Sequence, residues 1–303
     1  MKVKKEKKKF KNRLNIGNFP KVKYYDYQDK IFKYFALACT LFGVAALGLL
    51  LYNVLSTGLG RIDWDFIIDG PSRRAASAGI FTALIGTLWI MVITAVIAFP
   101  IGISAAIYLE EYAKKSRLAN ILEINISNLA GVPSIIYGLL GLELFARMMN
   151  LGGSILTGSL TLALLILPII IVSTREALKT VPYAIREASY ALGATKWQTI
   201  WNQVLPASIS GIFTGVILAL SRAMGETAPL IVIGAFTFVS SAPTGIMDGF
   251  TVLPIQIFNW VSRPQQAFSV NAAAAIIVLL SITFIMNGIA VYLRHRWQKK
   301  IKW

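Results

Sequence analysis

The sequence has very few of the residues from which disulfides, metal centres and charged surfaces are built. Its 303 residues include a single cysteine, Cys39, and a single histidine, His295, and only 15% of the residues are charged. One cysteine excludes a disulfide within the chain, and one histidine with one cysteine is too few for a His/Cys metal centre. Soluble domains carry about 25% charged residues, so the shortage of charge argues against a soluble protein.

Apolar residues take the place of the missing charge. They make up 56% of the chain, and the mean hydropathy is +0.63. A helix crosses the hydrocarbon core of a bilayer, about 30 Å thick, with about 20 such residues. The sequence therefore predicts an all-α membrane protein with six transmembrane helices, at Ile31–Leu55, Ser77–Leu109, Ile124–Ala146, Gly152–Thr174, Ser208–Phe236 and Asn271–Leu293.

Two apolar segments do not have the length of a simple span. The second run is longer than the bilayer is thick, so it must tilt, break or project, and Pro100 offers a point for a bend. The run Thr251–Val261 is too short to cross and is expected to form a helix at the outer surface or a re-entrant segment.

The net charge of +16 is concentrated at the two ends of the chain, in the stretches KVKKEKKKFKNR and RHRWQKKIKW. Both stretches flank predicted spans, where basic residues face anionic lipid on the cytoplasmic side. We interpret residues 1–30 as a cytoplasmic basic tail and residues 31–303 as a transmembrane domain. We expect membrane lipid, and no nucleic acid, as the partner of these charges. Most other basic residues fall on the same side, which predicts that both termini are cytoplasmic in a bacterial plasma membrane.

The loop between the fourth and fifth predicted spans has the pattern of two short helices. Pro182 suits the first turn of one helix, and Gly193 suits the residue at which it stops. Thr195 and Gln198 have the spacing of a capping box for the next helix, which Pro206 would limit. We call the two helices the hook and residues 175–207 the coupling loop.

The first helix of the hook has a face of small residues, Ala184, Ala188 and Ala191, which would allow close docking of a partner. The same pattern also fits an amphipathic linker that lies on the membrane surface. Periodicity alone does not separate these two interpretations.

The spacing of Glu187-Ala188-Ser189, Gly193 and Leu205-Pro206 resembles the EAA signature of ABC importer permeases, with Ser189 in place of the second alanine. The resemblance implies a type I ABC importer permease fold with a cytoplasmic coupling-helix hook. It further implies that Glu187, Ala188 and Gly193 dock the chain on a separate ATPase. The chain contains no G-x-x-x-x-G-K-[ST] loop, so we expect a permease subunit without its own ATPase site, not an enzyme.

The fifth predicted span contains a charged pair. Arg222 and Glu226 lie one helical turn apart near its middle, where each charge costs about 2.5–3.5 kcal/mol. Pro229 cannot donate a hydrogen bond to Gly225, which weakens the helix beside Glu226. The freed carbonyl is tolerated where it lines a cavity, and a guanidinium can hold two oxygens of an oxyanion. These features favour a substrate path, and a pair that neutralises itself inside the bundle is the alternative.

The stretch Arg222–Pro229, RAMGETAP, and the stretch GVPSIIYG at 131–138 resemble the PstA-type permeases of phosphate importers. The resemblance implies a path for phosphate through Arg222 and Glu226, and no cofactor. It also implies three partners: a sister permease of the PstC type, a pair of ATPase subunits and an extracytoplasmic phosphate-binding protein.

Other functions fit the sequence less well. A permease for another oxyanion, such as sulfate or molybdate, is the nearest alternative. A secondary transporter would be expected to show inverted repeats or paired broken helices. A membrane enzyme lacks support because the H-E-x-x-H and G-x-S-x-G motifs are absent. An additional role in phosphate sensing stays open.

Overall fold

The structure is a computed structural model that describes residues 20–113, 117–235, 239 and 241–298. The basic tail expected at residues 1–30 thus lies, up to residue 19, outside the described residues. The described elements follow in the order α2 (Pro20–Gly58), η2 (Leu59–Arg61), α3 (Trp64–Ile68), η3 (Ala75–Ser77), α4 (Phe81–Ile107), η4 (Tyr108–Tyr112), α5 (Arg117–Leu129), α6 (Ser134–Gly141), η5 (Leu142–Met148), α7 (Ile155–Lys179), α8 (Tyr183–Ala191), α9 (Lys196–Thr199), η6 (Ile200–Val204), α10 (Leu205–Gly225), α11 (Ala228–Val232), α12 (Leu253–Val261) and α13 (Gln266–Gln298).

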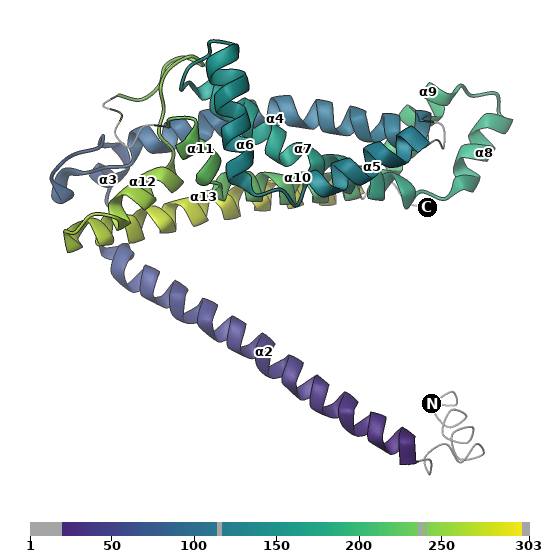
Figure 1. Cartoon of the computed structure of the whole chain (residues 1–303), viewed down its shortest axis with the longest axis horizontal. Helices are drawn as coiled ribbons and strands as arrows, with labels where there is room; N and C mark the ends of the chain where they lie inside the picture. Colours follow the sequence, from purple (N-terminus) through teal and green to yellow (C-terminus); the bar gives the residue numbers. More distant parts are fainter. Residues whose placement is uncertain (1–19, 114–116, 236–238, 240, 299–303) are drawn as a thin grey trace. The chain divides into compact units, whose positions relative to one another are not determined.

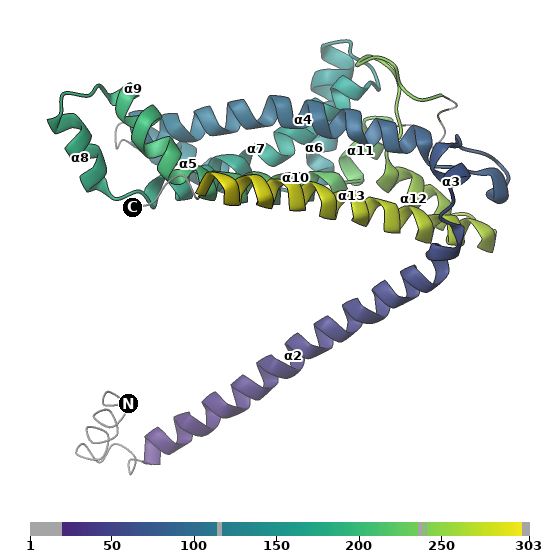
Figure 2. The same ribbon diagram turned by 180° about the vertical axis from the view of Figure 1, so that it is seen from behind.

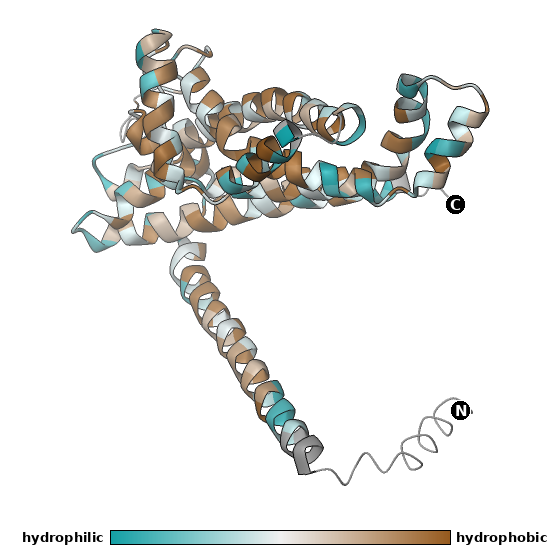
Figure 3. Cartoon of the chain, turned by 45° about the vertical axis from the view of Figure 1, so that its right-hand side comes forward, coloured by the Kyte–Doolittle hydropathy of each residue, from teal (hydrophilic) through white to brown (hydrophobic). Residues whose placement is uncertain are grey.

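The chain divides into two compact units, Met1–Ser56 and Thr57–Trp303. In its described part the first unit is the helix α2, which is hydrophilic near its start (teal in Figure 3) and largely apolar along the rest of its length (brown). Large apolar side chains on all sides of this helix are exposed. Such a surface is unfavourable in water and suits the hydrocarbon core of a bilayer. The helix covers the first predicted span.

The second unit is a bundle in which the long helices α4, α7, α10 and α13 run side by side (Figures 1 and 2). Helix α7 contacts both α4 and α10, and α10 contacts α13. Their shared core consists of apolar and small residues, among them Met91, Ile166 and Ala219. The helices α8 and α9 lie at one end of the bundle, which we call the hook end, and α3 and α12 lie at the opposite end.

Glycines allow α10 to approach α7 closely. A Cβ atom on Gly211 would lie 2.6 Å from the Cβ atom of Ala177, and one on Gly215 would clash with the side chain of Ser173. The spacing of Gly211 and Gly215 in the sequence predicts close contact with another helix. The structure confirms this contact and identifies α7 as the partner.

The third predicted span, Ile124–Ala146, is not one straight helix. Within the described residues, five helices are long and apolar enough to cross a membrane, and a sixth crossing exists if the pair Asn120–Leu129 and Ser134–Met148 counts as one. The two parts of this pair meet at an angle of 101°. Pro133 precedes the second helix and has no N–H for continuing the first. The hydroxyl of Tyr137 donates a hydrogen bond to the Leu129 carbonyl across the bend, at 2.8 Å.

Two prolines disrupt their helices less than the sequence suggests. Pro206 was expected to limit the second helix of the hook, and this prediction is wrong, because α9, η6 and α10 form one continuous helix, Lys196–Gly225. The segment η6 is a π-helical turn that ends at Val204, two residues before Pro206. Its altered hydrogen-bond pattern accommodates the missing N–H. Likewise Pro100 lies inside α4 without ending it. The expected short helix at Thr251–Val261 is confirmed as α12.

Candidate functional site

Arg222 and Glu226 lie at a break in the helix, as the position of Pro229 predicts. Helix α10 ends at Gly225, the backbone of Glu226 is extended at φ −75° and ψ 125°, and α11 begins at Ala228. The Nε atom of Arg222 lies 3.3 Å from a carboxylate oxygen of Glu226. The sequence predicted the pair near the middle of the fifth span, with the helix weakened beside Glu226. The structure places the pair where α10 ends, because Pro229 starts a new helix and does not continue the old one.

A small hollow borders the carboxylate of Glu226. Five helices and the residue before α12 line it, through Thr87, Ile90, Met91, Leu162, Ala223, Met224, Leu230, Val252 and Pro254. The residues from α4 and α7 belong to the parts of those helices that are remote from the hook. The side chain of Arg222 is 40% exposed, against 16% for Glu226. The guanidinium is therefore on the surface of the single chain, and the carboxylate lies beneath it.

The two stretches that resemble PstA-type permeases contact each other. Gly138 on α6 lies against Pro229 on α11, so closely that a Cβ atom on Gly138 would be 2.7 Å from the Cα atom of Pro229. Helix α6 of the bent pair therefore packs against α11, the helix that follows the break beside Glu226. Sequence reasoning identified both stretches but did not predict that they meet.

The hook has the predicted two helices. Pro182 precedes the first turn of α8, and Gly193 follows its end with φ +84°, a left-handed conformation that favours glycine. Thr195 and Gln198 form the predicted capping box at the start of α9. The hydroxyl of Ser189 lies 2.9 Å from that of Thr199 and joins the two helices. This contact gives a role to the serine that departs from the EAA signature.

Helix α8 presents one face outward and buries the other. The outward face consists of Ala184, Glu187, Ala188 and Ala191, all of them exposed. Arg186, on the opposite face, is buried. Helix α8 therefore offers a small-residue surface with one acidic side chain, which is the surface that the EAA resemblance assigns to ATPase docking.

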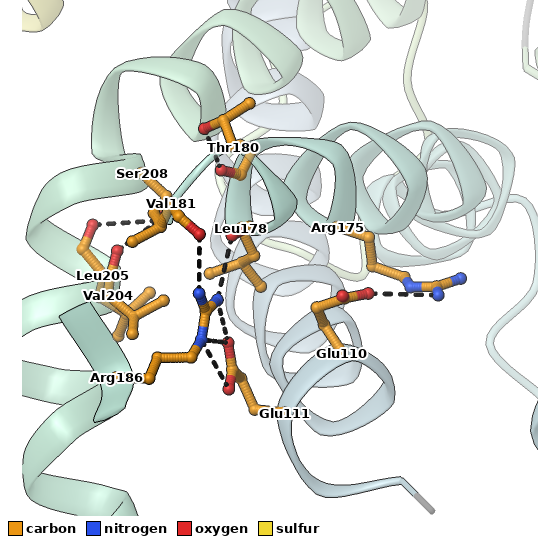
Figure 4. A network of polar contacts seen from close by, with 11 residues as sticks. Glu110, Glu111, Arg175, Leu178, Thr180, Val181, Arg186, Val204, Leu205 and Ser208 are labelled. Atoms are coloured by element: carbon orange, nitrogen blue, oxygen red, sulfur yellow. Dashed lines mark hydrogen bonds and ion pairs between the residues drawn. The ribbon is translucent and has the colours of Figure 1, made fainter. Parts of the chain in front are cut away.

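An ion-pair network behind the hook was missed in the sequence analysis (Figure 4). Arg186 contacts Glu111 through Nε and Nη2, at 3.1 and 2.6 Å. Arg175 contacts Glu110 at 3.3 Å and Glu123 at 3.0 Å. The available signal was the pair of adjacent glutamates at the end of the overlong second apolar run. The helix continues beyond the apolar run through η4. There the two glutamates contact arginines of the coupling loop.

Near this network, burial raises the pKa of Tyr190, and the carboxylate of Glu111 acts in the same direction. A phenol with the ordinary pKa of about 10 is already protonated at neutral pH, and this environment disfavours its ionisation further. Among the residues that the structure describes, no group of three or more His, Cys, Asp or Glu side chains is placed to hold a metal ion.

Comparison with known families decides the class of protein. The model of the family described as "Binding-protein-dependent transport system inner membrane component" matches residues 98–299. The chain belongs to this family. It is therefore a multi-pass inner-membrane permease of an ABC importer, a class that works with a separate ATPase and a substrate-binding protein.

Several curated relatives match over most of the chain. The phosphate transport system permease protein PstA of Yersinia pestis is 34% identical over 87% of this chain and 88% of its own length. PstA 1 of Mycobacterium tuberculosis is 32% identical over 84% of this chain and 85% of its own length. The probable ABC transporter permease protein YqgI of Bacillus subtilis is 29% identical over 82% and 90%. The resemblance to PstA-type permeases is confirmed.

Among solved structures, an inward-facing form of the MetNI methionine ABC transporter matches with a TM-score of 0.58. The match covers 72% of this chain and 97% of that one at 17% identity. At this identity the likeness concerns the fold alone, and it confirms the type I importer permease fold that the sequence predicts.

Proposed function

We propose that this chain is the PstA-type transmembrane subunit of a phosphate importer and forms half of its translocation path. The observation that carries the proposal is the Arg222–Glu226 pair at the break between α10 and α11. The names of the PstA relatives support phosphate as the substrate.

The chemistry of the pair suits a phosphate anion. A guanidinium is planar, permanently charged and able to bind two oxygens at once. Glu226 balances the charge of Arg222 while no anion is present, which keeps an empty site from holding phosphate too tightly. Because Arg222 is exposed on the single chain, a sister permease of the PstC type would complete the path by covering it.

The coupling loop would connect this path to ATP hydrolysis. The exposed residues Glu187 and Ala188 and the turn at Gly193 form the surface that docks on a pair of ATPase subunits. An extracytoplasmic phosphate-binding protein would deliver the substrate to the opposite end of the bundle. Both termini would then be cytoplasmic, as the distribution of basic residues predicts.

Uptake of labelled phosphate tests the proposal, in cells whose sole phosphate importer carries each variant. We expect Arg222→Gln to abolish uptake while the complex still assembles. Arg222→Lys should recover little, because a point charge does not replace the fork, and Glu226→Gln should also reduce uptake, because it leaves Arg222 uncompensated.

Arg147→Gln is the matched control, because Arg147 forms the same kind of pair with Glu143, four residues away and largely exposed. Its uptake should equal that of the unmodified protein. Normal uptake by the Arg222→Gln complex would show that the pair is structural and would end the proposal for these residues. Competition by excess sulfate or molybdate separates the alternative substrates: if either suppresses phosphate uptake, the path serves another oxyanion.

A further inference from the structure

We propose that the buried pair of Glu111 and Arg186 is the link through which the first helix of the hook moves the transmembrane helices α4 and α7. The inference deepens the proposed coupling function and rests on it. It assigns Arg186 and Glu111 as positioning residues, since they transmit the movement and touch neither phosphate nor ATP.

A single guanidinium joins three elements. Arg186 projects from α8, and its Nε and Nη2 atoms donate to Glu111 in η4, the direct continuation of α4. Its Nη1 atom donates to the Val181 carbonyl at 2.8 Å, and Nη2 also donates to the Leu178 carbonyl at 3.1 Å. These carbonyls belong to the end of α7 and the turn that follows it, where the last carbonyls of a helix lack their regular intrahelical partners. The Leu178 carbonyl also accepts from the Val181 N–H, at 3.3 Å. Helix α8 therefore cannot shift without breaking this set or taking α4 and α7 with it.

Because the ion pair is buried, it contributes little net stability to the fold. The side chains of Arg186 and Glu111 are 9% and 7% exposed. Removing two charges from water costs about as much as their attraction returns, so a well-packed apolar pair is often as stable or more so. The gain from an ion pair is instead a defined geometry, because a guanidinium fork fits a carboxylate in one plane. We infer that the pair sets the position of α8 relative to the bundle.

Both helices that Arg186 holds reach the hollow beside Glu226. Helix α4 extends from the hook end to Ile90 and Met91, and α7 extends to Leu162, all three of which line the hollow. The distance along α4 is roughly 30 Å at 1.5 Å per residue. The second helix of the hook reaches the site differently, because α9 continues through η6 into α10, which carries Arg222. The two halves of the hook thus act on different walls of one site.

The test replaces the pair by apolar residues of similar size, in the double variant Glu111→Leu/Arg186→Met, within the complete importer in proteoliposomes. Apolar replacement keeps the packing and removes the geometry. We expect the subunits to co-purify and ATP to be hydrolysed as before. Phosphate moved per ATP should fall about tenfold, the size of a typical coupling between sites. The single variant Arg186→Lys, which keeps the charge and loses the fork, should show the same loss in weaker form.

The matched control is Glu143→Leu/Arg147→Met, which removes an exposed pair outside the coupling loop, joined at 3.0 Å; it should leave the ratio unchanged. An unchanged ratio in the Glu111→Leu/Arg186→Met and Arg186→Lys variants overturns the proposal. So does a parallel loss of assembly, hydrolysis and transport in Arg186→Lys, since the pair would then only hold the fold.

A measurement that does not depend on the transported substrate tests this link separately from the proposal that the substrate is phosphate. Cys39 is the one cysteine of the chain, so Cys39→Ser allows a single label at Gly225→Cys, where a Cβ atom meets nothing within 4 Å. ATP should change the labelling rate of this cysteine, and the Glu111→Leu/Arg186→Met replacement should abolish the change. If the importer with an intact Glu111–Arg186 pair moves no phosphate but shows this ATP response, phosphate is not the substrate and the proposed link still holds. Persistence of the ATP response in the double variant would overturn the link whatever the substrate is.

Discussion

Gly193 has a conformation that other residues resist. Its φ of +84° lies in the left-handed region, and a Cβ atom there would meet nothing within 4 Å. Any effect of substitution therefore comes from the backbone and not from a clash. A left-handed conformation costs an L-residue about 1–2 kcal/mol, and most for a β-branched side chain.

We expect Gly193→Val to leave the protein inserted and to reduce the amount of ATPase that co-purifies with it. Gly193→Asn is the matched control, because asparagine adopts this conformation more readily, and it should recover most of the ATPase. Equal recovery from both variants and the wild type would contradict the requirement for a left-handed turn.

Glu187 allows a second test at the scale of the residue. Its side chain is exposed on α8, so Glu187→Lys should not alter the fold, and surface substitutions of this kind change stability by about 0.5 kcal/mol or less. We expect it to weaken the hold on the ATPase and to lower transport at unchanged expression. Glu143→Lys, at another exposed site, serves as the control. Undiminished ATPase recovery and transport in Glu187→Lys would remove the docking role of this residue.

The sequence predicted residue-scale features where the cause is local. The capping box of Thr195 and Gln198 and the break before Pro229 depend on neighbours a few residues away, and both are present. The contact of Arg186 with Glu111 spans 75 residues. It depends on how α4, α7 and α8 pack, which no local pattern contains.

At the scale of the helices, the sequence predicted apolar runs correctly but not their continuity. Hydropathy detects a run of apolar residues whether or not its backbone is straight, so the bend between α5 and α6 was not predicted. Conversely, Pro206 suggested a helix end where η6 lets the helix continue. The shape of a helix depends on its turns, and average hydropathy does not record them.

The contact of α7 with α10 yields a prediction at this scale. Gly215→Leu would force a large side chain against Ser173, and overpacking of this kind costs about 1–3 kcal/mol. We expect a lower melting temperature in detergent and weaker assembly. Gly48→Leu in α2 is the control, because a Cβ atom on Gly48 meets nothing within 4 Å. A Gly215→Leu protein as stable as the control would contradict the close packing.

For the whole molecule, the prediction concerns orientation. Reporter fusions at the C-terminus and at Gly245, in the segment between α11 and α12, should report opposite sides of the membrane, with the C-terminus in the cytoplasm. The physical reason is the bias of basic residues toward the cytoplasmic side. If both fusions report the same side, the six-span topology is wrong.

The π-helical turn η6 (Ile200–Val204) fixes the angular phase between the hook and Arg222. A π turn holds one residue more than the α-helix around it, and each residue of an α-helix accounts for about 100° of rotation. If the same residues formed a regular α-helix, α9 would therefore turn by about 100° relative to α10. Deleting Trp201, which is exposed, would instead remove the extra residue, restore an uninterrupted α-helix and keep the hook in its present direction. The π turn η6 thus sets the direction in which the hook points when Arg222 faces the path.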